Sequence, residues 1–139
     1  MIFWDASAVV ALLVNEKQTP FADTLYEKDP SMIVWWGTRV ECVSALAQGE
    51  RQSAYDTRML TNSSRALEVL TLAWREILPS QKVRENAERL LRVHPLRAAD
   101  SLQLAACLLA YGEQRITMAC FDERLTRAAR REGIEVHDS

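Results

Sequence analysis

The chain has 139 residues, the length of one domain. Hydrophobic residues make up 48% and charged residues 26% of it, which excludes a largely disordered polypeptide. No apolar run approaches the roughly 20 residues of a membrane helix. The formal net charge of -2 argues against a protein that attracts nucleic acid through a strongly basic overall field. We therefore expect a single domain spanning residues 1–139.

The first residues lack both the basic stretch and the small-residue cleavage site of a signal peptide, so we expect a cytoplasmic protein. The three cysteines, Cys42, Cys107 and Cys120, are odd in number and widely spaced, and they form no C-x-x-C pair. This pattern favours buried thiols over disulfides or zinc ligands.

In the first half of the chain, short apolar runs alternate with segments of helical periodicity. The predicted strands are 2–4 and 32–36, and the predicted helices are 7–14, 20–28, 38–48 and 55–74. We expect Gly49 to end the third helix and the sequence around Asn62 to interrupt the fourth.

The second half continues the alternation, with Ser80 as a helix cap and Gly112 and Gly133 as helix ends. The predicted strands are 77–78, 116–121 and 134–136, and the predicted helices are 81–93, 98–111 and 123–131. Together the two halves predict an α/β fold, with a central parallel sheet of about five short strands flanked by helices on both faces.

Four acidic residues occupy strand ends or helix starts. Asp5 and Asp122 end the first and fourth of the main apolar strands, and Glu41 and Asp100 lie in the first turns of helices. In a parallel sheet, ligands bind beyond the carboxyl ends of the strands. Carboxylates converging there would repel one another without a cation, and Mg²⁺ or Mn²⁺ prefers oxygen ligands. Such a site can hydrolyse phosphodiesters.

Each acid also has a purely structural interpretation. Thr38 and Glu41 match a capping box, and Asp100 could complement a helix dipole. Asp5 and Asp122 could each cap the helix that follows. A carboxyl group has two oxygens, so a cap and a ligand are compatible.

Four segments resemble the motifs of the PIN-domain ribonucleases, in particular the VapC toxins of VapBC toxin–antitoxin modules. They are residues 2–13, 40–46, 96–106 and 120–125, and the likeness extends over essentially the whole chain. The third segment, around Asp100, is the most specific. One departure is Cys120, which stands where many relatives have Thr or Ser.

The resemblance implies a PIN-like fold and a metal-dependent endoribonuclease toxin that cleaves RNA. It implies that Asp5, Glu41, Asp100 and Asp122 are the catalytic residues and hold Mg²⁺ or Mn²⁺, with Ser7 supporting the first acid. It further implies a homodimer, alone or within a larger assembly, neutralised by a VapB-type antitoxin.

Several alternatives stay open. Arg97 is a candidate RNA phosphate contact, or a solvated surface residue. The arginines at 124, 127 and 131 share one helix face, which could line an RNA groove or simply face solvent. Cys120 and the acidic charge also suit a catalytically inactive PIN-like module that binds RNA or protein. A haloacid dehalogenase-type phosphatase is disfavoured, because Ser7 stands where that family has its second acid.

Overall fold

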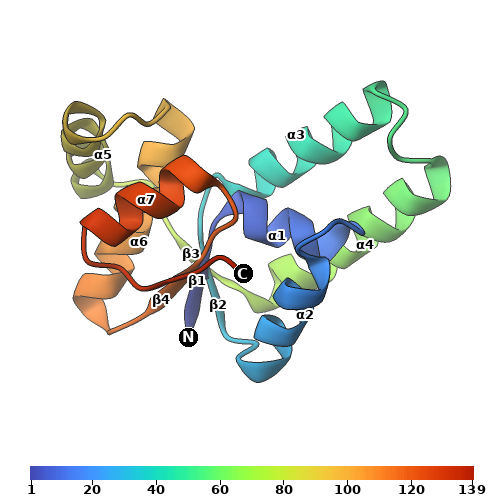
Figure 1. The fold of residues 1–139 in the computed structure, drawn as a ribbon, viewed down its shortest axis with the longest axis horizontal. Coiled ribbons are helices and arrows are strands. Elements are labelled where there is room, and N and C mark those ends of the chain that lie inside the picture. The colour runs from blue at the N-terminus through green and yellow to red at the C-terminus, as the bar shows by residue number, and fades with distance from the viewer.

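A computed structural model describes residues 1–139, and its centre is one sheet of five parallel strands (Figure 1). The strands are β1 (Ile2–Trp4), β2 (Met32–Trp35), β3 (Arg75–Ile77), β4 (Thr117–Ala119) and β5 (Val136–His137). They lie side by side in the order β3-β2-β1-β4-β5, and every pair is parallel. The predicted fold class is confirmed, and β1 and β4 are neighbours.

Seven helices cover the two faces of the sheet. They are α1 (Ala6–Leu13), α2 (Thr19–Lys28), α3 (Thr38–Arg51), α4 (Thr57–Ala73), α5 (Gln81–Val93), α6 (Ala98–Glu113) and α7 (Glu123–Arg131). Figure 1 shows α1 to α4 on one side, with α3 and α4 projecting as an arm, and α5 to α7 on the other. None of these helices combines the length and hydropathy that a membrane crossing requires.

The alternation of side chains along β1 builds two separate cores. Phe3 packs into the hydrophobic cluster formed with α5, α6 and α7. Ile2 and Trp4 pack into the cluster formed with α1, α3 and α4. Successive strand residues point to opposite faces, so a strand covered on both sides must be apolar throughout. All three residues of β1 are buried.

In the arm, α3 ends two residues beyond the predicted Gly49, and the break predicted near Asn62 in α4 is absent. Helix α3 continues through Gly49 to Arg51. The glycine at position 49 makes room for the Tyr55 ring, because a Cβ atom here would lie 2.0 Å from that ring. Helix α4 is unbroken, because Ser63 is buried and its Oγ donates to the carbonyl oxygen of Leu13 at 2.7 Å.

Other differences concern element ends. Helix α6 passes through Gly112, and β3 and β5 are shifted relative to 77–78 and 134–136. Strand β4 stops at Ala119, so a short connection precedes Asp122. Ser80 caps α5 as predicted, and Gly133 follows α7 with φ of 90°, a conformation that glycine adopts without strain. The three cysteines are free and buried, as expected.

The contact between Gly49 and Tyr55 gives a test of the arm. We expect Gly49→Ala to lower the free energy of unfolding by about 1–3 kcal/mol, the usual cost of overpacking. In a Tyr55→Ala background the same change should instead stabilise the protein by about 0.5–1 kcal/mol, because alanine favours a helix interior. Urea denaturation of the four proteins measures both values. Equal effects in the two backgrounds would contradict the proposed steric cause.

Candidate functional site

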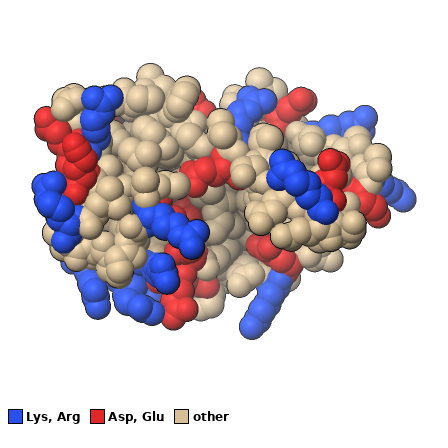
Figure 2. All heavy atoms as spheres, turned by 90° about the horizontal axis from the view of Figure 1, so that it is seen from above, with Lys and Arg blue, Asp and Glu red and all other residues tan.

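The four predicted acids lie at one edge of the sheet. Trp4 pairs with Ala119, so β1 and β4 end side by side, and the backbone N–H of Asp5 donates to the Ala119 carbonyl at 3.1 Å. Glu41 and Asp100 lie in the first turns of α3 and α6, and Asp122 is the N-cap of α7. Figure 2 shows the face seen from above in Figure 1, where acidic side chains line a hollow between the two halves of the molecule.

Asp5 is the innermost acid, with only 4% of its surface exposed. Its Oδ1 accepts hydrogen bonds from the Ser7 hydroxyl at 2.7 Å and from the Ala8 N–H at 3.2 Å, so Asp5 caps α1. Burial raises the pKa of Asp5 to about 7, and the hydrogen bonds only partly oppose this shift. The nearby charge of Glu41 raises the pKa further.

Ser7 joins Asp5 to the segment that follows β4. Its hydroxyl donates to Asp5 and accepts a hydrogen bond from the backbone N–H of Phe121 at 2.9 Å. The side chain expected to support the first acid therefore also fixes the connection that leads to Asp122.

Glu41 is held by a residue that sequence reasoning did not identify. The Nε2 of Gln103, a buried side chain of α6, donates to Glu41 Oε2 at 2.6 Å and to Thr38 Oγ1 at 2.9 Å. The predicted capping box is absent, because Gly37 is the N-cap of α3 and no side chain caps the helix. The only sequence signal for Gln103 is a polar residue one turn after Asp100 within an apolar run.

The remaining two acids, Asp100 and Asp122, are close enough for the charge of one to affect the other. Burial raises the pKa of Asp100, and the charge of Asp122 raises it further. The guanidinium groups of Arg97 and Arg124 act on Asp100 in the opposite direction. Asp122 itself caps α7, with one carboxylate oxygen accepting the Leu125 N–H at 2.8 Å.

The four acids therefore form a succession of mutually repelling neighbours. The charge of Glu41 raises the pKa of Asp5, the charge of Asp100 raises the pKa of Glu41, and the charge of Asp122 raises the pKa of Asp100. No three acidic, histidine or cysteine side chains are arranged to hold one metal ion together. Mg²⁺ needs less than that, because it typically binds through one or two carboxylates and keeps several waters. The oxygen-only donor set therefore fits a hydrated divalent ion.

The neighbouring cysteines do not add thiolate ligands. Burial raises the pKa of Cys42 to about 12, and it raises the pKa of Cys120 as well. The Cys120 thiol contacts the backbone carbonyl of Asp122 at 3.5 Å, while the Asp122 carboxylate is oriented by the helix cap. The orientation of Asp122 therefore depends on α7 and not on the Cys120 thiol.

Sequence and structure comparisons identify relatives with this arrangement of elements. The chain is 30% identical over 136 residues to two Mycobacterium tuberculosis proteins, ribonuclease VapC45 and ribonuclease VapC49. The alignment covers 98% of this chain and 94% of each relative. No family model matches the sequence.

Solved structures with the same fold are more distant in sequence. VapC20 of M. tuberculosis, described as a sarcin-ricin loop cleaving toxin, is 19% identical, with a TM-score of 0.66 over 92% of this chain and 95% of VapC20. FitAcB from Neisseria gonorrhoeae is 16% identical, with a TM-score of 0.67 over 99% and 97% of the two chains. A toxin–antitoxin complex from Klebsiella pneumoniae is 14% identical, with a TM-score of 0.63 over 91% and 90%.

The burial of Asp5 predicts a pH-dependent stability. Because its pKa is higher in the folded protein than in the unfolded chain, the folded state binds more protons between about pH 4 and pH 7, and stability falls as the pH rises through that range. We expect Asp5→Asn to reduce this slope and, above pH 7, to stabilise the metal-free protein by a few kcal/mol, at about 1.4 kcal/mol per pKa unit. Urea denaturation in EDTA at a series of pH values tests this, with the exposed Asp23→Asn as the control. An unchanged slope would refute it.

The Gln103 contact predicts a shift confined to Glu41. Gln103→Met keeps the length of the buried side chain but removes the donor that stabilises ionised Glu41, so the pKa of Glu41 should rise. A carbon-13 NMR titration of the glutamate carboxyl groups measures this pKa, with Glu41→Gln assigning the resonance. Gln48→Met, on the exposed side of α3, should leave it unchanged. An identical Glu41 titration in the Gln103 variant would rule out the assigned contact.

Proposed function

The chain belongs to the VapC ribonuclease family, and on that basis we propose that Asp5, Glu41, Asp100 and Asp122 form its metal-dependent catalytic site. The activity is that of an endoribonuclease toxin, which hydrolyses RNA phosphodiester bonds. The observation that supports the site best is the grouping of these acids at one sheet edge, where burial and neighbouring negative charge raise the pKa values of Asp5, Glu41 and Asp100.

Mg²⁺ or Mn²⁺ is the proposed cofactor, and when bound it supplies Lewis-acid activation of water and of the phosphodiester. The protein contributes the positions of the ligands. Ser7 holds the Asp5 carboxylate by donating to Oδ1, and Gln103 holds Glu41 by donating to Oε2. The α7 backbone holds Asp122 through the Leu125 N–H.

Cation binding and ionisation of these acids are linked. Asp5, with a pKa near 7, is partly protonated at neutral pH without a cation, and a divalent ion favours its charged form. Arg97 stands at the start of α6 beside Asp100, and we assign it the contact to an RNA phosphate. An arginine there can bind the substrate backbone without acting as a metal ligand.

A VapB-type antitoxin is the proposed protein partner, and a homodimer is the proposed assembly. Family membership supports both, and a toxin–antitoxin complex is among the structures that share the fold. The arm formed by α3 and α4 also exposes large apolar side chains that a partner could cover. Val40 and Val43 lie on α3, and Val69 and Leu72 lie on α4.

The alternative is a catalytically inactive module that only binds RNA or protein. It is favoured by the finding that no three potential ligands converge on one metal position. The two functions differ in a direct way, because only the nuclease requires a divalent ion.

Substitution of the acids tests the proposal. We expect Asp5→Asn and Asp100→Asn each to lower the rate of RNA cleavage by about 100-fold or more, because each removes a charge that stabilises the cation and the transition state. Asp23→Asn, on the exposed side of α2, should cleave at the wild-type rate. Circular dichroism should show all three variants folded.

Calorimetric titration with Mn²⁺ separates the nuclease from the binding module. The wild-type protein should release or absorb heat on binding, and Asp100→Asn should bind Mn²⁺ more weakly. Wild-type protein that gives no heat and cleaves no RNA would support the inactive module instead. Cleavage at the wild-type rate by both asparagine variants would refute the assigned site.

A further inference from the structure

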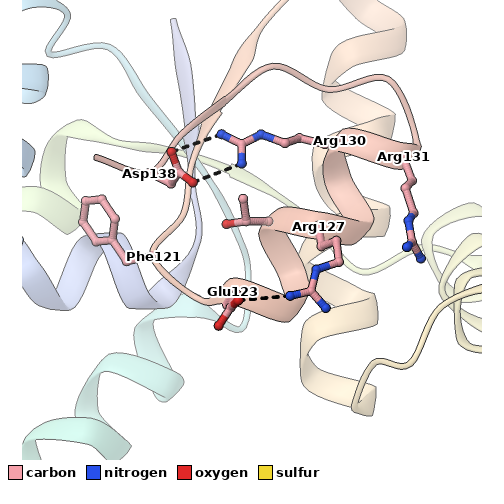
Figure 3. Close-up of a pocket in the computed structure, with 7 residues that line it drawn as sticks. Phe121, Glu123, Arg127, Arg130, Arg131 and Asp138 are labelled. Carbon is pink, nitrogen blue, oxygen red and sulfur yellow. Dashed lines mark hydrogen bonds and ion pairs between the residues drawn. The ribbon is translucent and has the colours of Figure 1, made fainter.

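A second feature near the acids is a cleft of about 550 Å³ between α7 and the C-terminal segment (Figure 3). Its α7 wall carries Glu123 and the arginines Arg127, Arg130 and Arg131. Phe121 and Asp138 lie on the same side of the cleft, and Arg131 lies on the opposite side. We call this feature the α7 cleft.

The α7 cleft is lined by more positively charged than negatively charged side chains. Arg130 forms two contacts with the Asp138 carboxylate, at 3.0 Å and 3.1 Å, and Arg127 pairs with Glu123 at 3.0 Å. Arg131 forms no ion pair. Three guanidinium groups therefore face two carboxylates. The paired geometry at Arg130 is the one in which a guanidinium also binds a phosphate.

The carboxylate at Arg130 is weakly held. The side chains of Arg130 and Asp138 are 50% and 37% exposed, and exposed ion pairs contribute little to stability. Asp138 follows the short strand β5 and belongs to no helix or strand. A stronger anion can therefore replace it without disturbing a core.

The α7 cleft is joined to the proposed catalytic acids. The backbone N–H of Phe121 donates to the Ser7 hydroxyl, which in turn donates to Asp5. Asp122 directly follows Phe121 in the chain. The Phe121 ring also contacts Phe21 of α2 edge to face, with centroids 6.0 Å apart. The half-buried Phe121 therefore belongs both to the segment that leads to Asp122 and to the lining of the α7 cleft.

From this arrangement we propose that the α7 cleft binds a backbone phosphate of the RNA strand next to the cleavage site. In the free protein Asp138 occupies the phosphate position on Arg130, and the RNA displaces it. The inference rests on the proposed function for the location of cleavage, and it adds a substrate contact at the last turn of α7. It makes Asp138 an internal competitor of the substrate.

The experiment measures RNA binding apart from cleavage. Cleavage-deficient Asp100→Asn protein in EDTA is titrated into a short, fluorescently labelled single-stranded RNA, and anisotropy gives Kd over a range of salt concentrations. Asp138→Asn and Arg130→Gln are added singly to this background. Arg51→Gln, at the far end of α3 in the arm, is the matched control. Thermal unfolding establishes that each variant is folded.

The two substitutions at the ion pair should act in opposite directions. Asp138→Asn should tighten RNA binding by up to about fivefold, the strength of a surface ion pair. Arg130→Gln should weaken binding by about fivefold and lower the slope of log Kd against log salt by about 0.7, the value for one phosphate contact on a single strand. Arg51→Gln should change neither quantity.

A purely structural ion pair gives a different result, since losing either partner would lower the unfolding temperature and leave RNA affinity unchanged. Unchanged affinity in both variants, or a change of the same sign in both, would overturn the proposal. Failure of the proposed function is recognised separately, by wild-type protein that binds no Mn²⁺ and cleaves no RNA. Opposite effects of Asp138→Asn and Arg130→Gln on affinity would support the α7 cleft even then.

Discussion

Repulsion between partly buried carboxylates is the constraint on which the structure at the carboxyl ends of the strands depends. Parallel strands bring their carboxyl ends to one edge, so the residues that follow β1 and β4 cannot avoid one another. Burial deprives Asp5 of water, and the charge of Glu41 adds to the cost of ionising it. A protein that only needed helix caps would gain nothing from placing four acids together in this way.

Side chains around the acids offset the cost of ionisation by donating hydrogen bonds to the carboxylates. Ser7 on α1 bridges Asp5 and the segment after β4, and Gln103 on α6 bridges Glu41 and Thr38 on α3. Each bridge connects elements that pack on different parts of the sheet. The same hydrogen bonds that stabilise the ionised acids therefore also fix the relative positions of the elements that carry them, and the chemistry of the site and the packing of the fold cannot be altered separately.

Helix α7 begins at an acid of the proposed site and ends in a basic turn. Its N-terminus is capped by Asp122, and its last turn carries Arg130 and Arg131, a distribution that complements the helix dipole. This arrangement sets an acidic hollow beside a basic surface despite the slightly negative net charge of the chain. A polyanionic substrate can thus approach a site built from carboxylates, because its flanking phosphates meet the arginines rather than the acids.

Much of the fold follows from local patterns. Apolar runs such as Ile2–Trp4 and caps such as Ser80 are read directly, because a short strand buried on both faces and a helix start have their own signatures. The errors fell on residues whose role is a long-range contact. Gly49 looks like the end of a helix, but it makes room for the Tyr55 ring. Ser63 looks like a helix break, but its hydroxyl donates to the Leu13 carbonyl.

The sequence by itself determined the α/β class and the order of the elements, and it singled out the four acids of the proposed site, because strand ends and helix starts can be located from local periodicity. Only the tertiary structure decided which acids are neighbours, that Gln103 holds Glu41, and that Asp138 returns to Arg130. These contacts join residues on separate elements or beyond a helix end. Hydrophobic periodicity carries no information about them, because they depend on how the two layers of helices pack against the sheet.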